Sequence, residues 1–261
     1  MVVPSEIVNA AIDGDNARVL AWLDADVAER RDANDVEEET GHTLLIAAAA
    51  DISSVAHVDL ARELIRRGAD VNVVEREELM SPFQLALLGG ETPGERARDF
   101  ALVLLGGGLA LKRSSGNWHP LGTAIAALKA GPTRAYAEVI FALLRAGAPL
   151  DATYQNMSAE RMFATFQSGR PELAHDEHWA ACTKLVADVR AAGGTWTAYR
   201  RHPRKQILRL RSLVLRGRAR PRVRTRAADP IPARVLRLPN EMCWHVLKFW
   251  RATSDATGEV I

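Results

Sequence analysis

The sequence predicts an all-α repeat fold built from stacked helix pairs. Two sets of anchor residues recur at a nearly fixed period, and apolar residues between them recur at helical spacing. The composition is that of a folded protein, with 48% hydrophobic and 25% charged residues in a chain of 261. Disorder is therefore excluded as the overall state, and the length suits one or two domains.

Three segments begin alike, at Thr43, Ser81 and His119, which are 38 residues apart. The side-chain oxygen of Thr43 or Ser81 can cap a helix N-terminus. Pro82 and Pro120 then suit the first helical position, where a missing N–H costs nothing. The sequence therefore predicts a first helix after each of these starts.

Three segments also end alike, on Gly68, Gly108 and Gly147, at spacings of 40 and 39 residues. Each glycine is predicted to end a second helix in the left-handed conformation. Apolar residues at helical spacing precede the first and third glycines: Val58, Leu60, Ala61, Leu64 and Ile65, and Tyr136, Val139, Ile140, Leu143 and Leu144.

These starts and ends resemble the T-P-L-H-x-A and L-L-x-x-G-A-D-V-N motifs of the ankyrin repeat family, and residues 64–72 are similar to the second motif. The family's period is about 33 residues. The longer period here predicts enlarged loops between the two helices of a unit, at 51–54, 89–94 and 129–133. The resemblance implies a solenoid with hairpin tips and a concave face that binds another protein.

Two weaker helix pairs flank the three clear ones, at residues 5–23 and 158–191. We therefore expect five units, at about 4–39, 40–77, 78–116, 117–154 and 155–199, with the outer two acting as caps. The last unit is predicted to contain a long insertion at 167–176.

Enzyme and metal motifs are missing from the sequence. The run 175–178 has two histidines without the H-E-x-x-H spacing or a third ligand, and the glycines 106–108 lack the lysine of a phosphate loop. Cys182 and Cys243 lie on apolar helical stripes and are predicted to be buried and inert. The sequence thus predicts no catalytic residue, no metal, no cofactor and no enzyme.

The sequence also bears on location. Its longest apolar run is twelve residues, too short to cross a membrane, and no signal peptide is visible at its start. Two cysteines rule out a disulfide scaffold. We expect a cytoplasmic or nuclear protein with no membrane partner.

The predicted hairpin tips carry residues suited to binding a partner. Trp118 and Tyr154 are the strongest candidate anchors, because interface energy concentrates in aromatic and arginine side chains. Packing of Trp118 beneath its own hairpin is an equally open alternative. The candidate partner-binding residues are Glu75, Arg76, Glu77, Glu78, Asn117, Trp118, Tyr154 and Gln155.

Charge divides the chain near Tyr199. Residues 200–261 carry 16 basic and 4 acidic side chains, whereas residues 1–199 have a net charge of −10. We expect a domain boundary there, followed by a basic helix at 205–215 and an arginine-rich linker, together spanning 200–230. The basic run 200–226 suits a nucleic-acid or nuclear-import patch. A solvated linker, or a strip lying on the acidic body, remains the alternative.

The segment from 238 to 250 resembles the opening of an F-box, L-P-x-E-L-x-x-x-I-L-x-F. The order of ankyrin repeats, basic helix and C-terminal Leu-Pro element also resembles that of ankyrin–SOCS-box proteins. Both resemblances imply a substrate receptor of a cullin–RING ubiquitin ligase. The residues implied to bind a cullin adaptor are Leu238, Pro239, Met242, Val246, Leu247 and Trp250. Alternatively, this segment (residues 231–261 in all) folds back and caps the last repeat.

The sequence therefore predicts a protein–protein interaction module, with the ligase receptor as its finer hypothesis. Two other classes stay open, a nucleic-acid-associated protein acting through residues 200–226 and a purely structural scaffold.

Overall fold

A computed structural model of the chain describes residues 2–25, 31–76, 79–89, 94–112, 119–151, 157–218, 238–239 and 242–243. The chain divides into two compact units, Met1–Val186 and Ala187–Ile261. Within the described residues the secondary structure is helical, apart from isolated β-bridges such as those that Val36 makes with Val2 and Thr43. The predicted all-α fold is confirmed.

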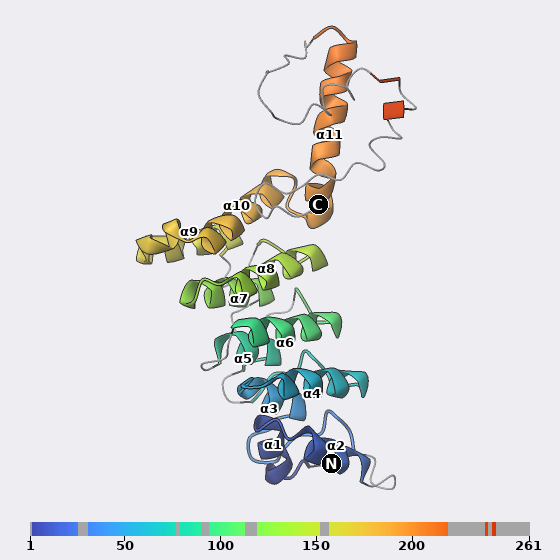
Figure 1. Cartoon of the computed structure of the whole chain (residues 1–261), viewed down its shortest axis with the longest axis vertical. Helices are drawn as coiled ribbons and strands as arrows, with labels where there is room; N and C mark the ends of the chain where they lie inside the picture. Colours follow the sequence, from blue (N-terminus) through green and yellow to red (C-terminus); the bar gives the residue numbers. More distant parts are fainter. Residues whose placement is uncertain are drawn as a thin grey trace. The chain divides into compact units, whose positions relative to one another are not determined.

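The first compact unit is a stack of helix pairs, which Figure 1 shows in chain order. The pairs are α1 (Ser5–Ile12) with α2 (Asn16–Asp24), α3 (Leu44–Ala50) with α4 (Val55–Arg66), α5 (Pro82–Leu88) with α6 (Gly94–Gly106), and α7 (Pro120–Ala130) with α8 (Arg134–Ala146). Helix α9 (Ala159–Gly169), the 3-10 helix η1 (Pro171–His175) and helix α10 (Glu177–Ala191) follow.

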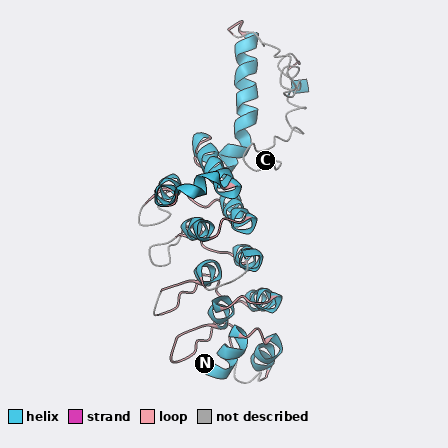
Figure 2. Ribbon diagram, turned by 60° about the vertical axis from the view of Figure 1, so that its left-hand side comes forward, coloured by secondary structure: helices cyan, strands magenta, loops and turns pink. Residues whose placement is uncertain are grey.

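The first helices of successive pairs pack on one another, and so do the second helices. The first helices form the interior, since every residue of α3 except Ala50 is buried. Alanines such as Ala47 and Ala124 let neighbouring helices approach closely while excluding water. The connections after α2 and α4 project on the same side of the stack (Figure 2).

Helix caps form where the sequence predicts them. The Thr43 hydroxyl accepts a hydrogen bond from the Ile46 N–H, and Ser81 does the same for Gln84. Pro82 and Pro120 are the first residues of α5 and α7. Each such cap stabilises a helix by about 1 kcal/mol.

The three glycines at the ends of the second helices are left-handed, as predicted. Their φ angles are 95° at Gly68, 96° at Gly108 and 96° at Gly147. An added Cβ would meet no atom within 4 Å at any of the three. Backbone conformation alone therefore favours glycine at these positions.

An asparagine joins each of the first two units to the next one. The Asn34 side chain donates to the Gly68 carbonyl at 2.9 Å and accepts from the Asp70 N–H at 2.6 Å. Asn72, 38 residues later, donates to the Gly108 carbonyl at 3.2 Å and accepts from the Ala110 N–H at 2.7 Å. Each asparagine side chain thus bonds a backbone carbonyl and a backbone N–H just after the second helix of the following unit. We call Asn34 and Asn72 the asparagine ladder.

The expectation of enlarged loops within units is wrong for 129–133. Helix α7 continues through Lys129 to Ala130, which leaves a connection of three residues before α8. The extra length lies in the helix, since α7 has 11 residues and α3 has 7. Leu128 is fully buried, and this burial extends the helix by another turn.

The expected insertion at 167–176 is also largely helical. Helix α9 runs to Gly169, and η1 fills most of the remainder. Leu173 and Trp179 are buried, and the Trp179 ring meets Phe163 edge-on at 4.7 Å. The Trp179 indole N–H donates to Gln167 at 3.2 Å, so this segment belongs to the core of its unit.

Helix α11 (Trp196–Leu215) belongs to the second compact unit. It begins well before the expected 205–215, because Thr195 caps it and the rings of Trp196 and Tyr199 pack against each other at 5.3 Å. It continues through Pro203. The charge break at Tyr199 thus lies inside a helix, and the compact units separate earlier in the chain.

Candidate protein-binding surface

Two connections between units contain the same turn. The Glu37 N–H donates to the His42 carbonyl at 2.9 Å, and the Glu75 N–H donates to the Met80 carbonyl at 3.0 Å. The two bonds lie 38 residues apart, so they are equivalent in successive units. We call residues 37–42 tip 1 and residues 75–80 tip 2.

In each tip, a residue among those that the structure describes has the left-handed conformation. In tip 1 this is Gly41, with a φ of 69°, and in tip 2 it is Leu79, with a φ of 56°. Leucine adopts this conformation at a cost of about 1–2 kcal/mol. Leu79 is also 53% exposed. No motif in the sequence points to Leu79, although the 38-residue period aligns it with Gly41.

Glu37 lies beneath tip 1 and is 5% exposed. It accepts hydrogen bonds from the Thr40 hydroxyl at 2.5 Å, the Thr40 N–H at 2.9 Å and the Ser5 hydroxyl at 2.7 Å. These donors, Thr40 first, lower the pKa of Glu37 to about 2. Tip 1 therefore holds a buried negative charge and is fixed in shape by it.

The two tips touch each other. His42 Nε2 lies 3.2 Å from the Glu75 carboxylate. A Cβ added to Gly41 would lie 2.6 Å from Cδ of Arg76, so the Arg76 side chain covers that glycine closely. Glu75, one of the predicted partner-binding residues, is 7% exposed, and its carboxylate faces His42. Arg76, another of them, is exposed.

The other predicted partner-binding residues lie outside the residues that the structure describes. They are Glu77, Glu78, Asn117, Trp118, Tyr154 and Gln155. Their partner-binding role stays a prediction.

The first helices of the pairs, which we call the inner helices, add little exposed surface to that of the tips. On α5 the most exposed side chain is Leu88, at 38%. Ala50 and Ala126 occupy equivalent places on α3 and α7, at a spacing of 38 residues from Leu88. This row is apolar.

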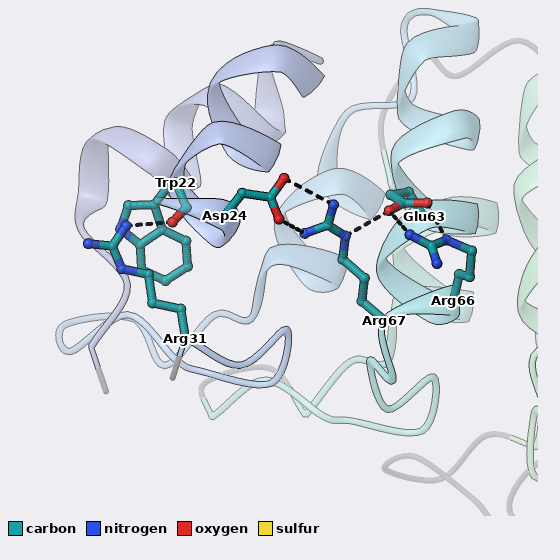
Figure 3. A network of polar contacts seen from close by, with 6 residues as sticks. All are labelled: Trp22, Asp24, Arg31, Glu63, Arg66 and Arg67. Atoms are coloured by element: carbon teal, nitrogen blue, oxygen red, sulfur yellow. Dashed lines mark hydrogen bonds and ion pairs between the residues drawn. The ribbon is translucent and has the colours of Figure 1, made fainter. Parts of the chain in front are cut away.

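The ends of α2 and α4 carry a polar network instead, shown in Figure 3. Arg67 donates to Asp24 at 2.6 Å and to Glu63 at 2.7 Å. Hydrogen bonds from Arg66 and Arg67 lower the pKa of Glu63 to about 2, and the bond from Arg67 lowers that of Asp24. Arg31 stacks on Trp22, with its guanidinium 4.9 Å from the ring centre. The contact between Arg67 and Asp24 joins units 1 and 2.

The described part of the C-terminal element packs on α11. Cys243 is 1% exposed and lies in a cluster with Ile207, and Leu238 packs against this cluster. The Cys243 N–H donates to the Pro239 carbonyl at 2.9 Å, which is the first bond of a helix. Met242 is 56% exposed. Val246, Leu247 and Trp250 lie outside the described residues, as do the arginines from 220 to 226.

Reactive groups are scarce in the described part of the chain. No group of three or more His, Cys, Asp or Glu side chains there is placed to hold a metal. Cys182 and Cys243 are buried as predicted, and burial raises the pKa of the Cys182 thiol to about 12. None of the helices in the same residues has the length and apolarity that crossing a membrane requires.

Comparison with known families agrees with this geometry. Residues 40–76 match the model of the ankyrin repeat family, and no curated protein matches the sequence. The match covers the last three residues of tip 1, α3, α4, Gly68 and the start of tip 2. Ankyrin repeats mediate protein–protein interaction and are typically non-catalytic. Residues 40–76 are an ankyrin repeat, and the fold around them is all-α and of the ankyrin-repeat type.

Proposed function

We propose that this chain binds a partner protein through its tips and inner helices, without catalysing a reaction, in the cytoplasm or nucleus. The observation that carries the proposal is the pair of interlocked tips, in which buried Glu37 and the His42–Glu75 contact hold exposed Arg76 and Leu79 in place. Prearranged side chains lose little entropy on binding, which favours affinity.

The finer proposal is that the chain is a substrate receptor of a cullin–RING ubiquitin ligase. It rests on the resemblance of the Leu-Pro element to an F-box or SOCS box. Exposed Met242 beside buried Cys243 supports it, because a helix that inserts into an adaptor groove needs an outward apolar face.

Affinity purification of the full-length protein tests both levels. Met242→Asp should abolish capture of a cullin adaptor and leave the melting temperature unchanged, because Met242 is exposed. Leu247→Asp should act likewise, since a charge in the adaptor groove costs several kcal/mol. Cys243→Asp is the folding control and should lower the melting temperature.

The outcomes separate the alternatives. Adaptor capture that persists in both Met242→Asp and Leu247→Asp contradicts the receptor role. A fall in melting temperature in Met242→Asp, with no adaptor captured from the wild type, supports the capping alternative instead. Loss of partner capture on replacing tip residues, with the adaptor still bound, supports the binding surface.

A further inference from the structure

We propose that tips 1 and 2 recognise a partner segment that carries lysine or arginine next to a large apolar side chain. This inference rests on the proposed function and assigns a chemical class to the partner. It follows from the charge of the tips and from the conformation of Leu79.

Negative charge collects at these two tips. Glu38 and Glu39 are exposed at the turn of tip 1. Glu37 adds a buried carboxylate, whose partners Ser5 and Thr40 are neutral hydroxyl and amide donors. Such donors form hydrogen bonds with the Glu37 oxygens but do not cancel the negative charge. That charge therefore adds to the electrostatic potential at the surface.

Glu75 contributes a second buried carboxylate. One of its oxygens, Oε2, lies 3.2 Å from His42. The other, Oε1, is buried and has no hydrogen-bond partner among the described residues. A buried carboxylate oxygen without a hydrogen-bond partner raises the free energy of the folded protein. A cation placed nearby offsets part of this increase. Arg76 and His42 are the cationic or protonatable residues described in the two tips, and the charges there sum to an acidic patch.

Leu79 supplies an apolar anchor beside this patch. It is 53% exposed although its backbone is left-handed, a conformation that glycine would adopt without strain. Backbone strain of this kind clusters at binding sites, where the side chain has a use that offsets its cost.

The acidic patch and the leucine together define the complementary ligand. Lysine or arginine would face the carboxylates, and an adjacent apolar side chain would cover Leu79. Charge of this sign also speeds the encounter with a basic segment and repels acidic ones.

Three fluorescein-labelled dodecapeptides test the proposal against the full-length protein by fluorescence anisotropy. The first alternates arginine, leucine and serine, the second has glutamate in place of arginine, and the third has serine in place of leucine. The first should bind, more weakly at physiological than at low salt, because screening weakens exposed charges. The second and third should bind at least about tenfold more weakly, a loss of about 1.4 kcal/mol.

Variants locate the site. Leu79→Gly removes the anchor together with its backbone strain, so weaker binding cannot be ascribed to unfolding. The double variant Glu38→Gln, Glu39→Gln removes exposed charge. Each should weaken binding of the first peptide about tenfold. The matched controls Leu102→Ser and Asp59→Asn replace exposed residues on the outer helices α6 and α4 and should have no effect.

Equal binding of the arginine and glutamate peptides overturns the proposal, as does binding that the tip variants leave unchanged. If the glutamate peptide binds more tightly and Leu79→Gly weakens it, the tips remain a binding surface and the assigned class is wrong. If none of the peptides binds, this inference fails, whereas partner capture by the full-length protein still decides the proposed function.

Discussion

The junctions after units 1 and 2 differ from the junction after unit 3. Asn34 and Asn72 each reach into the following unit with two hydrogen bonds. In unit 3 the equivalent residue is Lys112, and Pro149 stands where Asp70 and Ala110 donate their N–H groups. Proline has no N–H, so an asparagine at 112 would find no donor there. The third junction therefore lacks both the asparagine oxygen that would accept this hydrogen bond and the backbone N–H that would donate it.

Other contacts join units 3 and 4. Helix α6 packs on α8, with Phe100, Leu104, Val139 and Ile140 buried. On the outside, Arg98 pairs with Glu138 at 3.0 Å, and Arg134 pairs with the same carboxylate at 2.8 Å. Exposed ion pairs add only about 0–1 kcal/mol each. Apolar packing thus carries this junction, whereas directed hydrogen bonds supplement it in the first two units. Solenoid stability is a sum over such neighbours, so each junction can be altered separately.

The largest expected effect is at His57, which lies in the junction of units 1 and 2. It is fully buried, and its Nε2 donates to the Ile12 carbonyl at 2.9 Å. His57→Ala leaves that carbonyl without its donor and opens a cavity, so urea unfolding should show a loss of about 3 kcal/mol. His178→Ala, whose side chain is 30% exposed, is the control and should cost under about 0.5 kcal/mol. Similar losses in the two variants would contradict this role for His57.

Asn72→Ala should convert the second junction into one like the third. It removes two hydrogen bonds to unit 3 and should cost about 1–2 kcal/mol in urea unfolding. Hydrogen exchange should quicken at residues 108–110 and stay unchanged at 147–150. Lys112→Ala, the matched change at the third junction, should stay within about 0.5 kcal/mol of the wild type. Equal costs at the two positions would show that the asparagine bonds contribute nothing.

The sequence predicts the stack well because its signals are local. Caps such as Thr43 and terminal glycines such as Gly68 act within one helix end, so their spacing marks each helix directly. The extension of α7 and the helical state of 167–176 accompany burial of Leu128, Leu173 and Trp179 in the folded unit. Periodicity within a short window does not contain that information.

The candidate surface was predicted less completely. Tip positions follow from the repeat, but the contact that covers the Glu75 carboxylate comes from His42, which lies 33 residues earlier in the chain. The asparagine ladder had a readable signal, the Asp-x-Asn pattern at 32–34 and again at 70–72. Its meaning becomes visible only when the carbonyls of Gly68 and Gly108 are placed opposite those side chains.

Leu79→Gly should stabilise the protein, because it relieves backbone strain in tip 2. The substitutions at the junctions should instead lower stability, because they remove contacts. Glycine relieves the left-handed conformation, worth about 1–2 kcal/mol, and loses part of this through greater freedom in the unfolded chain. We expect a net gain of up to about 1 kcal/mol in urea unfolding. Leu88→Gly, a change at an exposed helical position, should instead destabilise the protein by about 1 kcal/mol. A loss of stability in Leu79→Gly would contradict the assignment of strain to this residue.

Acid should weaken the first two units before the third junction. Glu37 and Glu63 have pKa values lowered from 4.5 to about 2, by the hydroxyl and amide donors at tip 1 and by Arg66 and Arg67 respectively. A carboxyl with a lowered pKa stabilises the fold fully above its unfolded value, and this stabilisation is lost as the pH falls toward the folded value. The loss should therefore occur between about pH 4.5 and pH 2, and hydrogen exchange should quicken first at residues 37–42 and 63–67. Glu37→Gln should reduce the pH dependence at tip 1 and Glu63→Gln that at the end of α4, while residues 143–150 should respond equally in all three proteins. If residues 143–150 lost protection first, the acid-sensitive contacts would lie in the later units, and the contrast between the junctions would not extend to their charges.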